Sequence, residues 1–362
     1  MADLAAEDVR AAVAAGVLSE AQAAGLAAIA ARRRGFREHL PEDDEPFEFF
    51  RGFSEIFITV GLILLFTGIG GLGRLLGGFG PGALLTTNAL SAALAWHFAE
   101  YFTRHRRASL PSIALATFFA LNLTSLLVYL DAVTVGTIGP ERLALHTLVV
   151  ASGGLAAMVV YFWRFRLPFA TFLAGIFGAV VIFSTAGLLD PGAFADVRRP
   201  AQMFFDFRTS PTAALATLVF GLCAFFAAMH FDLRDPHRVS RYAASAFWLH
   251  LLAAPALVNT VIYTLYGLGG AAGNVATAAA LAAVALLALV IDRRSFLTAG
   301  LVYLGLLIGL AMRAAGTASS PVLTLLVLGA IVTILGTWWV PIRGSLLRAL
   351  PDFAWKSRLP PY

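Results

Sequence analysis

The chain has little charge and almost no cysteine. Only 13% of its 362 residues are charged, whereas a soluble domain has roughly 25%. The single cysteine, Cys223, lies within an apolar run. This excludes an internal disulfide bond and a metal site built from cysteines. Lysine is as scarce, since Lys356 is the only lysine among the 26 basic residues.

Motifs of several enzyme classes are absent as well. Neither His-Glu-x-x-His nor Gly-x-Ser-x-Gly occurs. The glycine-rich stretch 67–80 lacks the Lys-Ser/Thr ending of a phosphate-binding loop. The net charge of +5 comes from short arginine clusters between apolar runs. Anionic lipid explains this pattern better than nucleic acid. We therefore expect no enzyme, no cofactor, no bound metal and no nucleic-acid partner.

What the chain has in abundance is apolar sequence. Hydrophobic residues make up 59% of it, and the mean hydropathy is +0.81. A helix that crosses a bilayer needs about 20 mostly apolar residues. Ten such runs predict an all-α polytopic transmembrane bundle with short loops between residues 55 and 341. Their limits are 55–76, 82–102, 109–130, 143–163, 168–188, 211–231, 243–266, 271–291, 295–313 and 319–341.

The arginines predict the orientation of this bundle. If the N-terminus is cytoplasmic, the inner segments hold twenty Arg and Lys residues and the outer segments hold six. An excess of Arg and Lys is typical of cytoplasmic loops. It favours ten spans with both termini in the cytoplasm, because an error of one helix would scramble the pattern. The preference for Arg over Lys, with abundant Ala and Gly, suggests a GC-rich bacterial genome, hence a bacterial inner membrane.

Polar segments flank the predicted spans. Residues 1–37 predict a small cytosolic helical hairpin, in which Ser19 and Gln22 have the spacing of a capping box. An acidic and aromatic linker, 38–54, leads to the membrane interface. A basic cytosolic tail follows at 342–362.

Ionisable residues within spans are costly and are functional candidates. His97 and Glu100 lie three residues apart in the second predicted span, so they share a helix face. His250 lies in the seventh span, and His230 lies at the end of the sixth, followed by Asp232. If these spans are neighbours, the side chains form one titratable cluster in the inner leaflet. A proton relay or a weak His/carboxylate metal site would need such a cluster.

A structural interpretation of the same residues also stands. Glu100 can reach water beside Arg104, and the histidines can make polar contacts at the interface. An intramembrane enzyme would need the metal site, and no second His-x-x-Glu copy occurs within the predicted spans to complete it.

Amides and one proline give a second set of candidates. The amides in the outer halves of the spans are Asn88, Asn122, Asn259 and Asn274. Asparagines within spans often bridge helices, and they also line solute paths. Pro255 interrupts the seventh span and frees a carbonyl that needs a local partner or a cavity. With His250, Pro255 and Asn259, this span is the best candidate for a functional helix, although Pro255 could equally mark an ordinary packing kink.

Two blocks resemble known membrane proteins. The first 35 residues, with Ala-Gly-Val-Leu-Ser-Glu-Ala-Gln-Ala at 15–23, resemble the start of a family of uncharacterised bacterial multi-span proteins. The block Phe231-Asp-Leu-Arg-Asp-Pro-His-Arg through Ala246-Phe-Trp-Leu-His-Leu-Leu-Ala-Ala-Pro255 is similar to others of that kind. The resemblance implies architecture and location, and no activity.

Two functions therefore remain in competition. The preferred hypothesis is a small-solute or ion permease that uses the inner-leaflet His/Glu cluster. The alternative is a membrane-anchored accessory, assembly or sensor protein whose N-terminal hairpin binds a cytosolic partner.

Overall fold

The described part of the chain folds into helices and turns. The computed structural model describes residues 6–19, 22, 53–78, 80–135, 142–194, 200–235, 241–297, 300, 304–305, 308–309, 320–351, 356 and 359. No strand occurs among them, which confirms the all-α prediction for this part of the chain. The chain divides into two compact units, Met1–Pro46 and Phe47–Tyr362.

The first unit contains helix α1, Ala6–Ala14. The chain leaves this helix through Gly16, whose φ of 70° suits glycine. The predicted capping box is present. The Ser19 N–H donates to Gln22 Oε1 over 3.0 Å, and the Gln22 N–H donates to Ser19 Oγ over 3.2 Å. The rest of the predicted second hairpin helix lies outside the described residues.

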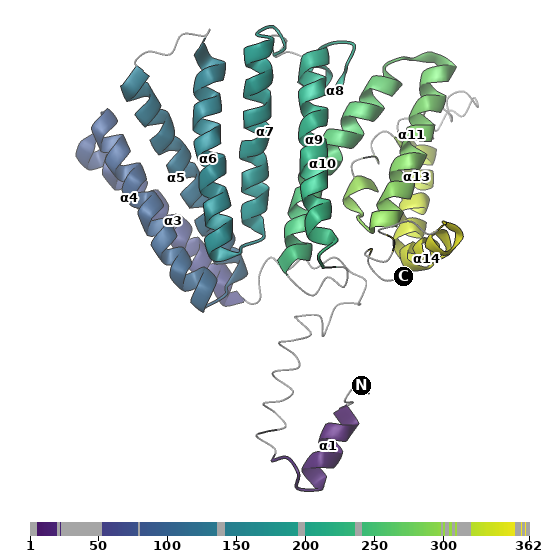
Figure 1. Cartoon of the computed structure of the whole chain (residues 1–362), viewed down its shortest axis with the longest axis horizontal. Helices are drawn as coiled ribbons and strands as arrows, with labels where there is room; N and C mark the ends of the chain where they lie inside the picture. Colours follow the sequence, from purple (N-terminus) through teal and green to yellow (C-terminus); the bar gives the residue numbers. More distant parts are fainter. Residues whose placement is uncertain are drawn as a thin grey trace. The chain divides into compact units, whose positions relative to one another are not determined.

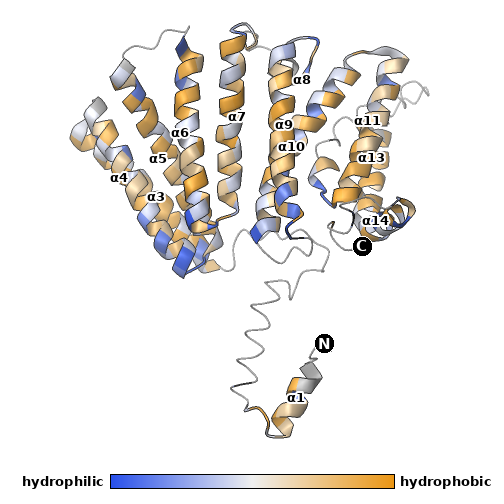
Figure 2. Cartoon of the chain, in the orientation of Figure 1, coloured by the Kyte–Doolittle hydropathy of each residue, from blue (hydrophilic) through white to orange (hydrophobic). Residues whose placement is uncertain are grey.

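The second unit contains seven helices that are long and apolar enough to cross a membrane. They are α3 (Phe53–Gly77), α5 (Ser109–Val135), α6 (Leu143–Phe165), α7 (Phe169–Leu189), α9 (Pro211–Asp232), α10 (Arg241–Tyr266) and α11 (Gly270–Ile291). Each coincides with a predicted run to within about five residues. Consecutive helices run up and down side by side (Figure 1). Apolar residues cover their lengths, and hydrophilic ones gather mostly near their ends (Figure 2). The helices fit an integral membrane protein.

The predicted count of ten spans is not confirmed. The described residues give seven candidates, or eight if a bent pair counts as one span. That pair is α13 (Ser320–Thr337) and α14 (Trp339–Ala349), with a 72° bend between them, where the sequence predicted one helix to residue 341. Helix α4 (Pro81–Ala99) is not among the seven, since Thr, Asn and His interrupt its apolar run. Most of the run 295–313 lies outside the described residues.

Small residues let the helices approach closely. Helix α9 packs along α10, α6 along α7, and α4 along α5, while α7 also contacts α9 and α10. Alanines such as Ala228, Ala246 and Ala253 are buried between helices. At Gly221 of α9, an added Cβ would lie 2.8 Å from Leu257 of α10. In the α9–α10 pair, which carries the candidate site, side chains of α10 therefore pack directly against the backbone of α9.

A short segment links α7 to α9. Helix α8, Pro200–Phe205, packs on α9 and α10. Asp206 follows it, is 2% exposed, and accepts hydrogen bonds from the Arg208 backbone and guanidinium. Burial alone raises the pKa of Asp206, but the hydrogen bonds and charge of Arg208 outweigh it, so this pKa lies below its ordinary value. Arg208 also donates to the Gly267 carbonyl at the end of α10.

Candidate functional site

Three ionisable side chains from three helical segments meet in the second unit. Asp232 is the last residue of α9, and His250 lies nine residues into α10. At 1.5 Å per residue, His250 is roughly 14 Å along α10 from its first residue. Arg293 follows Asp292, which ends α11 in the left-handed conformation with φ 57°. This turn brings Arg293 against both α9 and α10.

Asp232 is the centre of this group. His250 Nε2 lies 2.8 Å from Asp232 Oδ2. The guanidinium of Arg293 donates to both carboxylate oxygens, with 3.1 Å between Nε and Oδ2. It also donates to the Ala243 carbonyl over 3.2 Å. A bidentate Arg–carboxylate contact of this kind is strong and fixes both groups in orientation.

The group is almost closed to solvent. His250 and Arg293 are 0% exposed and Asp232 is 8% exposed. The rings of Phe225 and Phe296 pack against the imidazole, each with its centroid 5.7 Å from it, and their own centroids are 5.8 Å apart. Removing these charges from water is costly, and the attraction between them offsets that cost only with good geometry. With a neutral imidazole, the charges of Asp232 and Arg293 cancel. A proton added to His250 gives the cluster a net positive charge.

A neighbouring contact fixes the end of α11 to α14. The indole Nε1 of Trp339 donates to Asp292 Oδ1 over 2.6 Å. The Nε of Arg343 donates to the Leu289 carbonyl over 3.0 Å and lies 3.8 Å from Asp292 Oδ1. Because Asp292 and Arg293 are adjacent, the position of α14 is coupled to that of the Asp232–His250–Arg293 cluster.

The predicted pair His97 and Glu100 lies elsewhere in the bundle. Glu100 is the first residue of the π-helical segment η2 (Glu100–His105), which continues α4. Its carboxylate pairs with Arg104 at 2.9 Å and with Arg164 at 2.8 Å. His97 is exposed. Helix α4 packs mainly on α3 and α5, whereas α10 packs mainly on α9, α11 and α7. The structure therefore does not bring His97 and Glu100 to His250, and Glu100 lies beside Arg104 as in the structural interpretation.

The remaining predicted residues are also dispersed. Helix α10 continues through Pro255, which is exposed and lies on the opposite side of the helix from His250. Asn259 is half-buried on that opposite side. His230 is exposed two residues before Asp232.

Two of the predicted asparagines bond within their own helices. Asn88 donates to the Leu84 carbonyl over 2.7 Å, and Asn122 donates to the Phe118 carbonyl over 2.8 Å. Asn274 is half-buried in α11 and lines a cavity described below.

Sequence reasoning missed two features. It counted Arg293 as a loop arginine, although the side chain is fully buried. It also did not select His146, whose Nδ1 lies 2.5 Å from Asp131 Oδ2 at adjoining ends of α5 and α6. Among the described residues, His146 Nε2 has no hydrogen-bond partner. For His146 the available signal was an Asp and a His at facing ends of two consecutive antiparallel helices, α5 and α6. Arg293 and Asp232 lie at the ends of α11 and α9, which are not consecutive, so the sequence contained no comparable signal for Arg293.

No candidate metal centre emerges from the described part of the chain. It contains no group of three or more His, Cys, Asp or Glu side chains placed to hold an ion. The nearest approach, Asp232 with His250, has a guanidinium as its third member, and a cation is a poor neighbour for a metal ion. Comparison with protein-family models, with curated proteins and with solved structures found no match to this chain.

Proposed function

We propose that this chain is a permease for a small solute or ion, with ten spans and both termini in the cytoplasm of a bacterium. The observation that carries the proposal is the buried cluster of Asp232, His250 and Arg293. Ionisable side chains within an apolar bundle are expensive and commonly mark proton or substrate pathways. The apolar helices and the arginine bias of twenty against six support the membrane topology.

Protonation of His250 is the proposed coupling step. Histidine is the side chain whose charge changes most readily near neutral pH. In this cluster the added proton would create an uncompensated positive charge beside Phe225 and Phe296. That charge would favour a second arrangement of α9 and α10 in which water reaches the cluster. A proton or cation-linked permease needs such a bistable element.

The other predicted residues take secondary places in this proposal. Asn259 and Pro255 face away from His250 and are candidates for a solute path on the far side of α10. Asn274 is a candidate on α11, Asn88 is a candidate on α4, and Asn122 is a candidate on α5. His97 of α4 and Glu100 of η2 form a separate candidate proton route, and the exposed His230 of α9 is a candidate on its own.

A flux assay in liposomes tests the proposal. The purified chain is reconstituted with a pH-sensitive dye inside the vesicles, a pH gradient is imposed, and panels of small solutes and ions are added. We expect proton movement that requires one of the added solutes. His250→Gln should abolish it, while His105→Gln, which removes an exposed histidine of η2, should leave it unchanged.

Two results would count against this account. One is a protein that moves neither protons nor solute under any imposed gradient. The other is flux that survives His250→Gln but is lost in His97→Gln or Glu100→Gln, since the separate α4 route would then carry the protons.

The accessory or sensor function stays the second candidate function, because the N-terminal segment is a compact unit of its own. Its capping box is formed, as the bonds between Ser19 and Gln22 show. Deleting residues 1–45 separates the two functions. A permease keeps its flux in liposomes after the deletion, whereas an adaptor loses a cytosolic partner in a pull-down experiment.

A further inference from the structure

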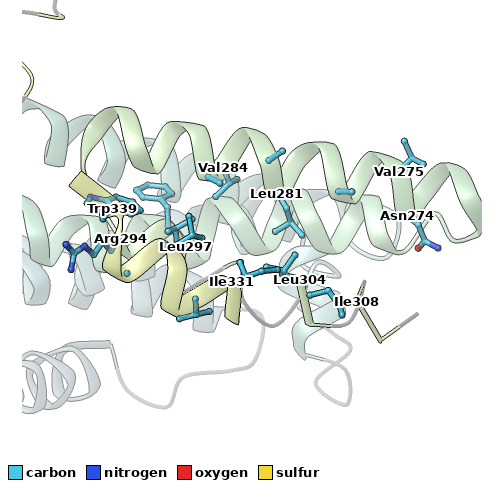
Figure 3. Close-up of a pocket in the computed structure, with 18 residues that line it drawn as sticks. Asn274, Val275, Leu281, Val284, Arg294, Leu297, Leu304, Ile308, Ile331 and Trp339 are labelled. Atoms are coloured by element: carbon cyan, nitrogen blue, oxygen red, sulfur yellow. The ribbon is translucent and has the colours of Figure 1, made fainter. Parts of the chain in front are cut away.

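An elongated apolar cavity of about 740 Å³ lies beside α11. Its walls come from α11, from the segment that follows Arg293, from α13 and from α14 (Figure 3). Between its ends the labelled lining residues are aliphatic: Leu281, Val284, Leu297, Leu304, Ile308 and Ile331. A polar solute would find almost no hydrogen-bond partner along these walls, whereas a hydrocarbon chain would find contact on all of them.

The two ends of the cavity differ in chemistry. Arg294 and Trp339 lie at one end, with the guanidinium carbon of Arg294 5.5 Å from the centroid of the Trp339 ring. Asn274 and Val275 lie at the other end (Figure 3). A basic residue beside a tryptophan is typical of the headgroup level of a membrane, where basic pockets between helices hold anionic lipid headgroups.

The cavity extends along most of α11. Its α11 lining runs from Asn274, near the start of the helix, to Ala285, twelve residues that cover roughly 16 Å of helix axis, and Arg294 follows the end of the helix at Ile291. Half of the hydrocarbon core of a bilayer is about 15 Å thick. The cavity is therefore long enough for one acyl chain, with its headgroup at the Arg294 end.

Helix α14, at the Arg294 end of the cavity, has the features of a helix that lies at the membrane surface. It turns by 72° from α13. Trp338 in the turn and Arg348 near its C-terminus are exposed. A helix that turns away from an apolar neighbour and carries tryptophan and arginine suits the interface between lipid tails and headgroups.

We infer that this cavity binds one acyl chain of an anionic phospholipid, whose phosphate lies against Arg294 and Trp339. The inference rests on placement of the helices in a bilayer and does not depend on transport. A bound lipid would fill the space between α11 and α13 and contact Phe296, which packs on His250.

Lipid binding to the purified full-length chain tests the inference. The delipidated protein is titrated in detergent with phosphatidylglycerol and with phosphatidylcholine of identical acyl chains, and bound lipid is counted by native mass spectrometry. The native chain should prefer phosphatidylglycerol by about fivefold, which is the contribution expected of one arginine near the headgroup.

Two variants separate the headgroup contact from the acyl-chain contact. Arg294→Gln should remove the preference and leave phosphatidylcholine binding in place. Leu281→Trp fills the cavity and should reduce binding of both lipids. The matched controls are Arg234→Gln and Leu286→Trp, since both side chains are exposed and neither lines the cavity. Both controls should behave as the native chain does.

Equal binding of the two lipids by the native chain would overturn the inference, and so would an unchanged preference in Arg294→Gln. If Leu281→Trp fails to give a monodisperse protein, Arg294→Gln decides alone, because that residue is only partly buried at the cavity end. Failure of the flux assay leaves this result untouched, so the two proposals can fail separately.

Discussion

Asp232 holds the cluster together, because its carboxylate contacts both of the other members. It faces the Arg293 guanidinium and the His250 imidazole in a region closed to water. Breaking a buried ion pair by removing one partner typically costs about 3–5 kcal/mol, because a buried charge loses its compensation. Loss of one charged member of the cluster should therefore destabilise the α9–α10–α11 region.

Asp232→Asn should accordingly lower the stability of the detergent-solubilised protein by about 3–5 kcal/mol. The measurement is equilibrium unfolding followed by tryptophan fluorescence. Glu100→Gln is the matched control, since its partners Arg104 and Arg164 are 46% and 40% exposed. Exposed pairs contribute up to about 1 kcal/mol. Equal losses of stability in the two variants would show that the Asp232 cluster contributes no more to stability than a surface ion pair does.

Individual residues also show where sequence reasoning reached its limit. It selected His250 as a residue to examine, because a histidine within an apolar run is unusual. It could not select Arg293, since an arginine that follows a span looks the same in sequence whether it meets water or a buried carboxylate. His97 and His250 were equivalent by sequence depth, yet one is exposed and the other fully buried. Only the packing of α10 against α9 and α11 distinguishes them.

At the scale of helices, α9 and α10 are held together by small residues. An added Cβ at Gly221 would lie 2.8 Å from two atoms of Leu257 and 3.1 Å from Ala256. Gly178 of α7 has nothing within 4 Å of such a Cβ. The two glycines therefore differ in packing, although both lie within helices.

Gly221→Ala should destabilise the protein by about 1–3 kcal/mol through overpacking, partly offset by the better helix propensity of alanine. Gly178→Ala should be neutral or stabilise by up to about 1 kcal/mol, since only the propensity changes. Thermal unfolding of both variants in the same detergent checks this. A stability gain in Gly221→Ala equal to that in Gly178→Ala would contradict close α9–α10 packing.

Asp206, which follows α8, should make the stability of the protein depend on pH. The pKa of Asp206 is below its ordinary value in the folded protein, so the unfolded chain binds the proton more tightly. Its contribution to stability is therefore present above the unfolded pKa of about 4 and is lost as the pH falls through the lower folded pKa. Unfolding temperatures of the native chain and of Asp206→Asn should converge below about pH 4. A difference that stays constant from pH 3 to pH 7 would show that protonation of Asp206 is not involved.

At the scale of the whole molecule, hydropathy predicted the helices well. The run predicted at 211–231 is α9, and the run predicted at 143–163 is α6. Hydropathy did not predict the break at Trp338. The apolar sequence continues from α13 into α14, and only the 72° bend separates the two helices. The count of spans depends on such joints and on the run 295–313, so it remains a proposal.

Labelling of introduced cysteines tests the ten-span topology. In a Cys223→Ser background, Thr209→Cys and Ala318→Cys flank four proposed spans, so both should react with a membrane-impermeant reagent in intact cells. His105→Cys should react only after permeabilisation. Labelling of Thr209→Cys without Ala318→Cys would mean that the run 295–313 does not cross the membrane, and the ten-span proposal would be wrong.

We propose that the Asp232–His250–Arg293 cluster carries a proton and does more than hold three helices together. The most direct measurement compares Asp232→Asn with the double variant Asp232→Asn/Arg293→Gln, which restores the balance of buried charge. We predict that the double variant recovers much of the stability lost in the single variant but carries no solute-dependent proton flux in liposomes. Native flux in the stable double variant would contradict the claim and leave the cluster with a structural role only.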